Sequence, residues 1–137
     1  MLNSQDWPLQ YDSFMFESQT LLNRCEECLA HLEMIGDDED AVLGLQNSLQ
    51  RLGNHARQAS APAMAALAEQ LHGCLDAAHG GCLGGEARSI IRSCLALLAW
   101  QLELIDPGTG ELPMDDGEQQ ELLERLAPAI SQHATDP

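Results

Sequence analysis

The sequence predicts an all-α protein folded as an antiparallel bundle of about five helices. Apolar residues recur at a three-to-four spacing through most of the chain, which is the period of one helical face. No segment alternates apolar and polar residues with the period of two that a half-buried strand requires. Glycines, prolines and aspartates separate the periodic stretches, which divides the chain into about five helices.

The first predicted helix runs from about Tyr11 to Ile35 and stops at Gly36, a residue that suits a helix C-terminus. Its inward-facing residues are Phe14, Leu21, Leu22, Cys25, Leu29, Leu32 and Ile35. Asp37 and Asp38 each offer a carboxylate that can cap the start of a second helix. The inner stripe of that second helix comprises Val42, Leu45, Leu49, Leu52 and Ala56.

A third and a fourth helix follow. Ser60 ahead of Pro62 resembles a cap followed by proline in the first turn, and the third helix is expected to run from there to Gly80 and Gly81. The fourth helix is expected to end at Asp106-Pro107-Gly108, because the residue before a proline disfavours helical geometry. The inward residues are Met64, Leu67, Ala68, Leu71 and Leu75 in the third helix and Ile90, Ile91, Cys94, Leu95, Leu98, Leu102 and Ile105 in the fourth.

The last predicted helix is capped by the Asp115-Asp116 pair and carries apolar residues at helical spacing. Pro128 is expected to bend or shorten it, because proline lacks a backbone donor. With 137 residues and 45% hydrophobic composition, the chain can bury one sizeable core. We therefore expect a single domain over residues 1–137, with its core at about 11–106 and an additional C-terminal helix at about 115–134.

The charge balance excludes several classes of function. The formal net charge is −16, and the six basic residues are all arginines. Nucleic acid and anionic membranes should therefore repel the protein, and the absence of lysine excludes Schiff-base and phosphate-loop mechanisms. No stretch approaches 18 uninterrupted apolar residues, and the first ten residues lack the features of a signal peptide, so a cytoplasmic location is expected.

Five cysteines, an odd number, favour reduced thiols over a disulfide framework. Cys25, Cys28 and His31 form a C-x-x-C-x-x-H sequence, which suggests a metal site. On a helix, however, the first and third of these residues lie about 120° apart around the axis, so one ion could not readily collect all three side chains. We expect no bound metal, and we expect Cys25 to act as a small buried hydrophobe.

Three stretches of the chain carry a family resemblance: YDSFMFESQTLLNRCEECLAHLE, DEDAVLGLQNSLQRLGNHA and SIIRSCLALLAWQLELID. With them, the run from Tyr11 to Pro107 resembles the histidine phosphotransfer (HPt) domain at the front of bacterial chemotaxis-type histidine kinases. The family pattern in the second helix is a histidine, a small or apolar pair, a lysine and a glycine. Matched from the DDED turn onward, this pattern falls on Gln50, Arg51, Leu52, Gly53 and Asn54. The phosphorylatable histidine and its lysine are therefore both missing.

The resemblance implies a surface on which a partner docks, without the residues that carry out phosphotransfer. Phosphotransfer needs an exposed imidazole nitrogen as nucleophile and a nearby cation, and Gln50 and Gly53 supply neither. We therefore expect no enzymatic activity and no cofactor. The expected function is that of an HPt-like module that binds a response-regulator receiver domain or a histidine kinase and modulates it by occupancy. The expected contact patch comprises Gln46, Asn47, Gln50, Arg51, Gly53, Asn54 and Arg57, in which Gly53 would let a partner helix approach closely.

Two alternatives remain open at this stage. His55 could be the phosphoacceptor of an active phosphorelay carrier, although it points about 140° away from Gln50 around the helix. The chain could also be an unrelated helical adaptor or regulator, with a helix-in-groove contact on the side of Leu97, Trp100 and Leu104.

Overall fold

The computed structural model describes residues 7–35, 38–76, 83–113 and 117–135. Within these residues the chain forms five α-helices, which confirms the expected all-α bundle: α1 (Trp7–Met34), α2 (Glu39–Gln58), α3 (Pro62–Asp76), α4 (Gly85–Leu104) and α5 (Gly117–Thr135). None of these helices has the length and apolar composition needed to cross a membrane. The expected stops at Gly36 and Gly80-Gly81 and the expected caps at Asp37 and Asp115-Asp116 lie outside the described residues.

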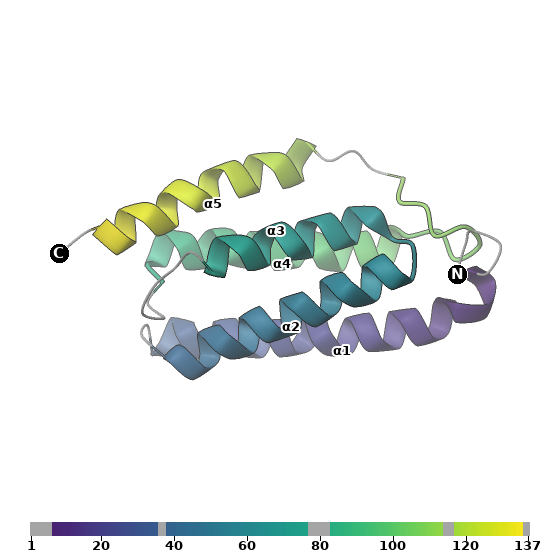
Figure 1. Ribbon diagram of the computed structural model, residues 1–137, viewed down its shortest axis with the longest axis horizontal. Coiled ribbons are helices and arrows are strands. Elements are labelled where there is room, and N and C mark those ends of the chain that lie inside the picture. The colour runs from purple at the N-terminus through teal and green to yellow at the C-terminus, as the bar shows by residue number, and fades with distance from the viewer. Residues whose placement is uncertain (1–6, 36–37, 77–82, 114–116, 136–137) are drawn as a thin grey trace.

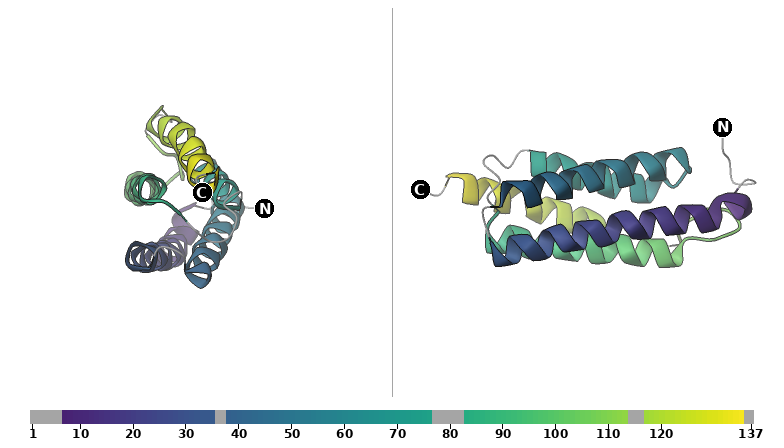
Figure 2. Two further views of the ribbon diagram at one scale, coloured as in Figure 1. Left: turned by 90° about the vertical axis from the view of Figure 1, so that its left-hand side faces the viewer. Right: turned by 90° about the horizontal axis from the view of Figure 1, so that it is seen from below.

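The first four helices form a bundle, and α5 lies against one side of it. α1 packs against α2 and α4, and α3 packs against the other side of α2 and also contacts α4. α5 contacts α3 and α4 and lies on the far side of the bundle from α1 and α2 (Figure 1). The left view of Figure 2 shows the same separation from the side, with α5 at the top and α1 and α2 towards the bottom. The outward side of the α1–α2 pair is therefore left open by α5.

Local chemistry sets the start of α2 as expected. Asp38 adopts an extended backbone conformation, and its carboxylate accepts a hydrogen bond from the Ala41 N–H at 3.2 Å. This bond satisfies one of the donors that a helix start leaves without a partner. The end of α4 also agrees with the sequence, because Ile105 leaves helical geometry immediately before Asp106-Pro107.

The turn between α2 and α3 differs from the expectation that Ser60 caps α3. α3 begins at Pro62, as predicted, but the residue before it is Ala61. Ser60 instead ends α2 in the left-handed region, with φ of 63°. Its N–H bonds to the Arg57 carbonyl and the Ala61 N–H bonds to the Ala56 carbonyl at 2.8 Å, which is the Schellman pattern that usually places glycine at this position.

The sequence predicts that Pro128 bends or shortens the last helix; shortening is wrong, and bending stays a prediction. α5 continues through Pro128 to Thr135. Leu126 precedes the proline and Ala129 and Ile130 follow it, and all three are buried in the same apolar cluster as residues of α1 to α4. This packing on both sides of the proline compensates for one lost backbone donor.

Within the described residues, the apolar core consists of two clusters along the bundle. The larger one draws on all five helices and includes Leu22, Leu49 and Leu71 among its fully buried side chains. The smaller one lies at the end that contains the α2–α3 turn, and its members are Phe14, Ala56, Ala59, Ala61, Met64, Ala65, Leu102 and Ile105. Alanine supplies half of the smaller cluster, so this end of the bundle buries less side-chain volume than the other.

Polar atoms mark the boundary between the two clusters. Among the described residues, the buried side-chain atoms without a hydrogen-bond partner are Ser18 Oγ, His55 Nε2 and Gln101 Oε1. Each residue lies, along its own helix, between a member of the larger cluster and a member of the smaller one. These flanking pairs are Leu22 and Phe14 on α1, Leu52 and Ala56 on α2, and Leu98 and Leu102 on α4. A layer across the bundle, in which these three side chains have hydrogen-bonding atoms without partners, thus separates the two parts of the core. We call it the polar level.

Candidate functional site

The outward side of α2 presents exposed polar side chains in the middle of the helix. Asn47, Gln50, Arg51 and Asn54 are all exposed, and we call these four residues the α2 patch. Gln46 is half-buried at its edge. Five of the seven residues expected to form the contact surface thus lie in or beside one exposed area, with Gln50 open to solvent.

Gly53 and Arg57 lie elsewhere, because they face α3. Gly53 is buried, and a Cβ added to it would lie 3.1 Å from Glu69 Cγ and 3.6 Å from Ala68 Cβ. Arg57 donates two hydrogen bonds to the Glu69 carboxylate, at 2.5 and 3.3 Å. Gly53 therefore allows the close approach of α3 of the same chain and not of a partner's helix. This corrects the expectation that Gly53 lies on an open surface.

His55 lies in the interface between α2 and α1. Its ring stacks on Phe14 with a centroid separation of 5.1 Å, and its Nδ1 is 3.2 Å from Glu17 Oε2. Nε2 is buried and has no hydrogen-bond partner. Phosphorylation at His55 requires an imidazole nitrogen that a partner's phosphoryl group can reach. One nitrogen faces a carboxylate and the other faces the core, so this arrangement does not present such a nucleophile.

A groove runs between α1 and α2 beside the α2 patch. It consists of two adjoining hollows, of about 330 and 410 Å³, and Arg24 from α1 and Arg51 from α2 line both of them. We call this feature the α1–α2 groove; its aromatic, charged and exposed polar lining residues are Phe16, Glu17, Thr20, Arg24, Asn47, Gln50 and Arg51. Arg24 and Phe16 were not among the predicted site residues, because only the packing of α1 on α2 brings them beside Gln50.

The two arginines of the groove differ from those that hold helices together. Arg57 pairs with α3, Arg92 pairs with Glu33 of α1, and Arg88 donates to the Leu32 carbonyl at 2.6 Å. Within the described part of the chain, Arg24 and Arg51 form no ion pair. Two arginines against the single carboxylate of Glu17 leave the lining of the α1–α2 groove with a net positive charge, on a protein with a formal charge of −16.

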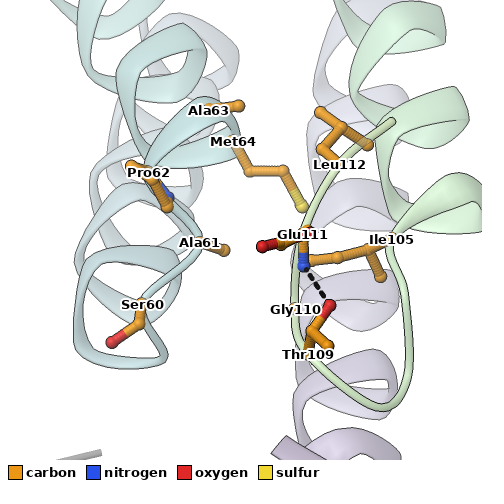
Figure 3. Close-up of a pocket in the computed structure, with 10 residues that line it drawn as sticks. All are labelled: Ser60, Ala61, Pro62, Ala63, Met64, Ile105, Thr109, Gly110, Glu111 and Leu112. Carbon is orange, nitrogen blue, oxygen red and sulfur yellow. Dashed lines mark hydrogen bonds between the residues drawn. The ribbon is translucent and has the colours of Figure 1, made fainter. Parts of the chain in front are cut away.

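A larger hollow, of about 490 Å³, lies at the end of the bundle between the start of α3 and the segment 105–112 (Figure 3). Met64 and Ile105 form an apolar floor, and Ser60, Thr109 and Glu111 lie at the exposed rim. The segment is held by its own hydrogen bonds, including those from the Gly110 N–H to the Asp106 carbonyl at 2.7 Å and from the Glu111 N–H to Thr109 Oγ1. The sequence predicted only the end of the fourth helix at Asp106-Pro107-Gly108 here.

Cys25 and Cys94 are protected by burial. Desolvation, aided by the neighbouring Cys28, raises the pKa of the Cys25 thiol from 9.0 to about 12. Desolvation has the same effect on the pKa of Cys94, with Cys74 as the second cause. His31 is exposed, whereas Cys25 is fully buried. The described residues contain no group of three or more His, Cys, Asp or Glu side chains placed to hold a metal ion.

The α4 residues at which an unrelated adaptor would make its helix-in-groove contact are only partly exposed. Trp100 and Leu104 are 59% and 40% exposed, but Leu97 is buried. Trp100 and Leu104 thus offer a small apolar area on α4, beside the exposed Glu103.

The fold and the surface thus define an all-α helical bundle with a polar, locally cationic face on its first two helices. Comparison of the chain with protein-family models, with curated proteins and with solved structures finds no match.

Proposed function

We propose that this protein is a catalytically silent, HPt-like signalling module. It binds a response-regulator receiver domain, or a histidine kinase, through the α2 patch and regulates that partner by occupancy. The observation that carries the proposal is the exposure of Gln50 at the centre of α2, at the position that corresponds by resemblance to the phosphoacceptor histidine. Its proposed place of action is the bacterial cytoplasm, where such receivers and kinases meet.

The proposal rests on the difference between binding a partner, which Gln50 can do, and accepting a phosphoryl group, which it cannot do. An amide side chain can donate and accept hydrogen bonds across an interface, but it cannot form the phosphoramidate of a phosphotransfer reaction. His55 is the only histidine on α2, and its nitrogens face Glu17 and the core. A partner that docks on α1 and α2 also meets no obstruction from α5, because α5 packs on α3 and α4.

The test measures complex formation and phosphoryl transfer in the same samples. A panel of histidine kinases and phosphorylated receiver domains is mixed with the wild-type protein under conditions that preserve phosphohistidine. We expect a saturable complex with at least one panel member and no acid-labile phosphoryl label on the protein. Label on the wild type that disappears in His55→Gln would show a working phosphorelay carrier and would refute the proposal.

The binding surface is tested with matched charge substitutions. Gln50→Glu places a new carboxylate in the α2 patch, whereas Gln120→Glu makes the same change at an exposed position on α5. We expect Gln50→Glu to weaken the complex and Gln120→Glu to leave it unchanged, with equal helical circular dichroism in both variants. Equal binding by the two variants would exclude the α2 patch as the contact surface.

A further inference from the structure

We propose that the α1–α2 groove binds a phosphoryl group carried by a protein partner, and that Arg24 and Arg51 are the residues that hold it. The inference deepens the proposed function and rests on it for the class of the partner. Arg24 and Arg51 come from facing helices and line the same two hollows, and neither pairs with a carboxylate in the described part of the chain. Two guanidinium groups are thus available to one ligand in the groove.

The donor set suits a phosphoryl group better than a carboxylate. One guanidinium fork already matches both oxygens of a carboxylate, whereas a phosphoryl group has three acceptor oxygens and a charge of about −2 and can accept bonds from two forks. Asn47 and Gln50 add amide donors to one hollow, whereas in the other the Thr20 hydroxyl donates to the Phe16 carbonyl at 2.8 Å and Glu17 adds a carboxylate. The groove therefore offers charge and neutral donors together.

The surroundings favour a phosphorylated protein over a small free phosphate. The net charge of −16 repels free anions at long range, so a phosphate ion gains little beyond its contacts with the two arginines. A protein partner adds contacts outside the groove. Phe16 lines one hollow and is 73% exposed, and an aromatic ring beside arginines is typical of the residues that dominate protein interfaces.

The chemistry of the groove is tested on the full chain alone, with phenyl phosphate as the probe and benzoate as its carboxylate counterpart. Binding is followed by NMR of the arginine Nε–H groups at low ionic strength. We expect saturable shifts of Arg24 and Arg51, and at least about tenfold tighter binding of phenyl phosphate than of benzoate. Absence of saturable shifts, or equal binding of the two probes, would overturn the inference.

Matched variants distinguish the effect of the groove arginines on phenyl phosphate binding from the effect of the protein's net charge. Arg24→Gln/Arg51→Gln and Arg125→Glu each change the formal charge by two units, and Arg125 is exposed on α5. We expect the double variant to lose phenyl phosphate binding and Arg125→Glu to retain it within about twofold. Equal losses in the two variants would assign the effect to overall charge and refute the groove.

The partner is tested with receiver domains in two forms, one unmodified and one loaded with beryllofluoride as a phosphoryl mimic. We expect the wild-type protein to bind a loaded receiver about tenfold more tightly than the unmodified one, and the double variant to lose this preference. Equal binding of both forms would overturn the inference and leave the proposed function intact. Phenyl phosphate binding without any complex with a receiver or kinase would support the groove and refute the proposed function.

Discussion

Gly44 is a position where the structure predicts that a normally stabilising substitution brings no benefit. In the interior of a helix, replacing glycine with alanine raises the free energy of unfolding by about 1 kcal/mol. Gly44 lies within α2, but a Cβ added there would be only 2.8 Å from the Cys28 Sγ of α1. The thiol must therefore move before alanine fits.

The expected change in the free energy of unfolding depends on how easily the Cys28 thiol can move aside. In a helix, χ1 near +60° is rare, so the Cys28 thiol has few rotamers in which to make room, and overpacking of this kind costs about 1 kcal/mol or more. This cost cancels the gain in helix propensity. Gly44→Ala should leave the free energy of unfolding unchanged or lower it by about 1 kcal/mol.

A double-mutant cycle isolates the contact. In a Cys28→Ala background the obstruction is gone, so Gly44→Ala should raise the free energy of unfolding by about 1 kcal/mol, a coupling of about 1 to 2 kcal/mol between the two positions. Gly73→Ala is the control, because nothing lies within 4 Å of a Cβ at this helical position. The measurement is urea denaturation followed by circular dichroism. A gain at Gly44 equal to that at Gly73, with Cys28 present, would refute the predicted contact.

Four further predictions concern stability. Ser60→Gly should raise the free energy of unfolding by about 1 kcal/mol, because glycine adopts the φ of 63° without strain, and a loss in urea denaturation would contradict this. Ser18→Ala should raise it by about 1 kcal/mol, since the buried Ser18 hydroxyl has no hydrogen-bond partner; a decrease of that size would show that the hydroxyl is satisfied. Arg88→Met should lower it by about 1 to 2 kcal/mol through loss of the bond to the Leu32 carbonyl, and an unchanged midpoint would argue against that bond. For Cys25 and Cys94 the pKa is raised from 9.0 to about 12, so between these pH values the unfolded chain loses thiol protons that the folded chain keeps, and stability should fall as pH rises above 9. Burial also raises the pKa of Cys28 and Cys74, so part of the slope should remain in Cys25→Ala/Cys94→Ala. A slope between pH 9 and 11 as steep in that variant as in the wild type would contradict the assignment to Cys25 and Cys94.

The helices were predictable because each one buries a stripe of apolar residues against its neighbours. Local cap chemistry at Asp38 and the proline after Asp106 also placed two boundaries correctly. Ser60 was misassigned because the sequence shows a capping residue beside a proline but not the path of the chain. That path is set by the two hydrogen bonds that end α2.

The candidate site was only partly predictable, for a reason specific to α2. This helix packs against both α1 and α3, so its buried arc is wider than the leucine stripe suggests. The position of α3 decides that Gly53 is buried, and the position of α1 decides that His55 stacks on Phe14. Arg24 belongs to the groove only through tertiary packing, which periodicity within one helix does not reveal.

The polar level at Ser18, His55 and Gln101 gives the bundle a preferred place to open. Cooperative units in a protein follow continuous apolar packing, and here that packing is interrupted between the large cluster and the alanine-rich one. The end that carries the Ser60 turn and the hollow of Figure 3 can therefore loosen as a separate unit. Arg24 and Arg51 lie along the larger cluster, so local melting of that end leaves their spacing intact.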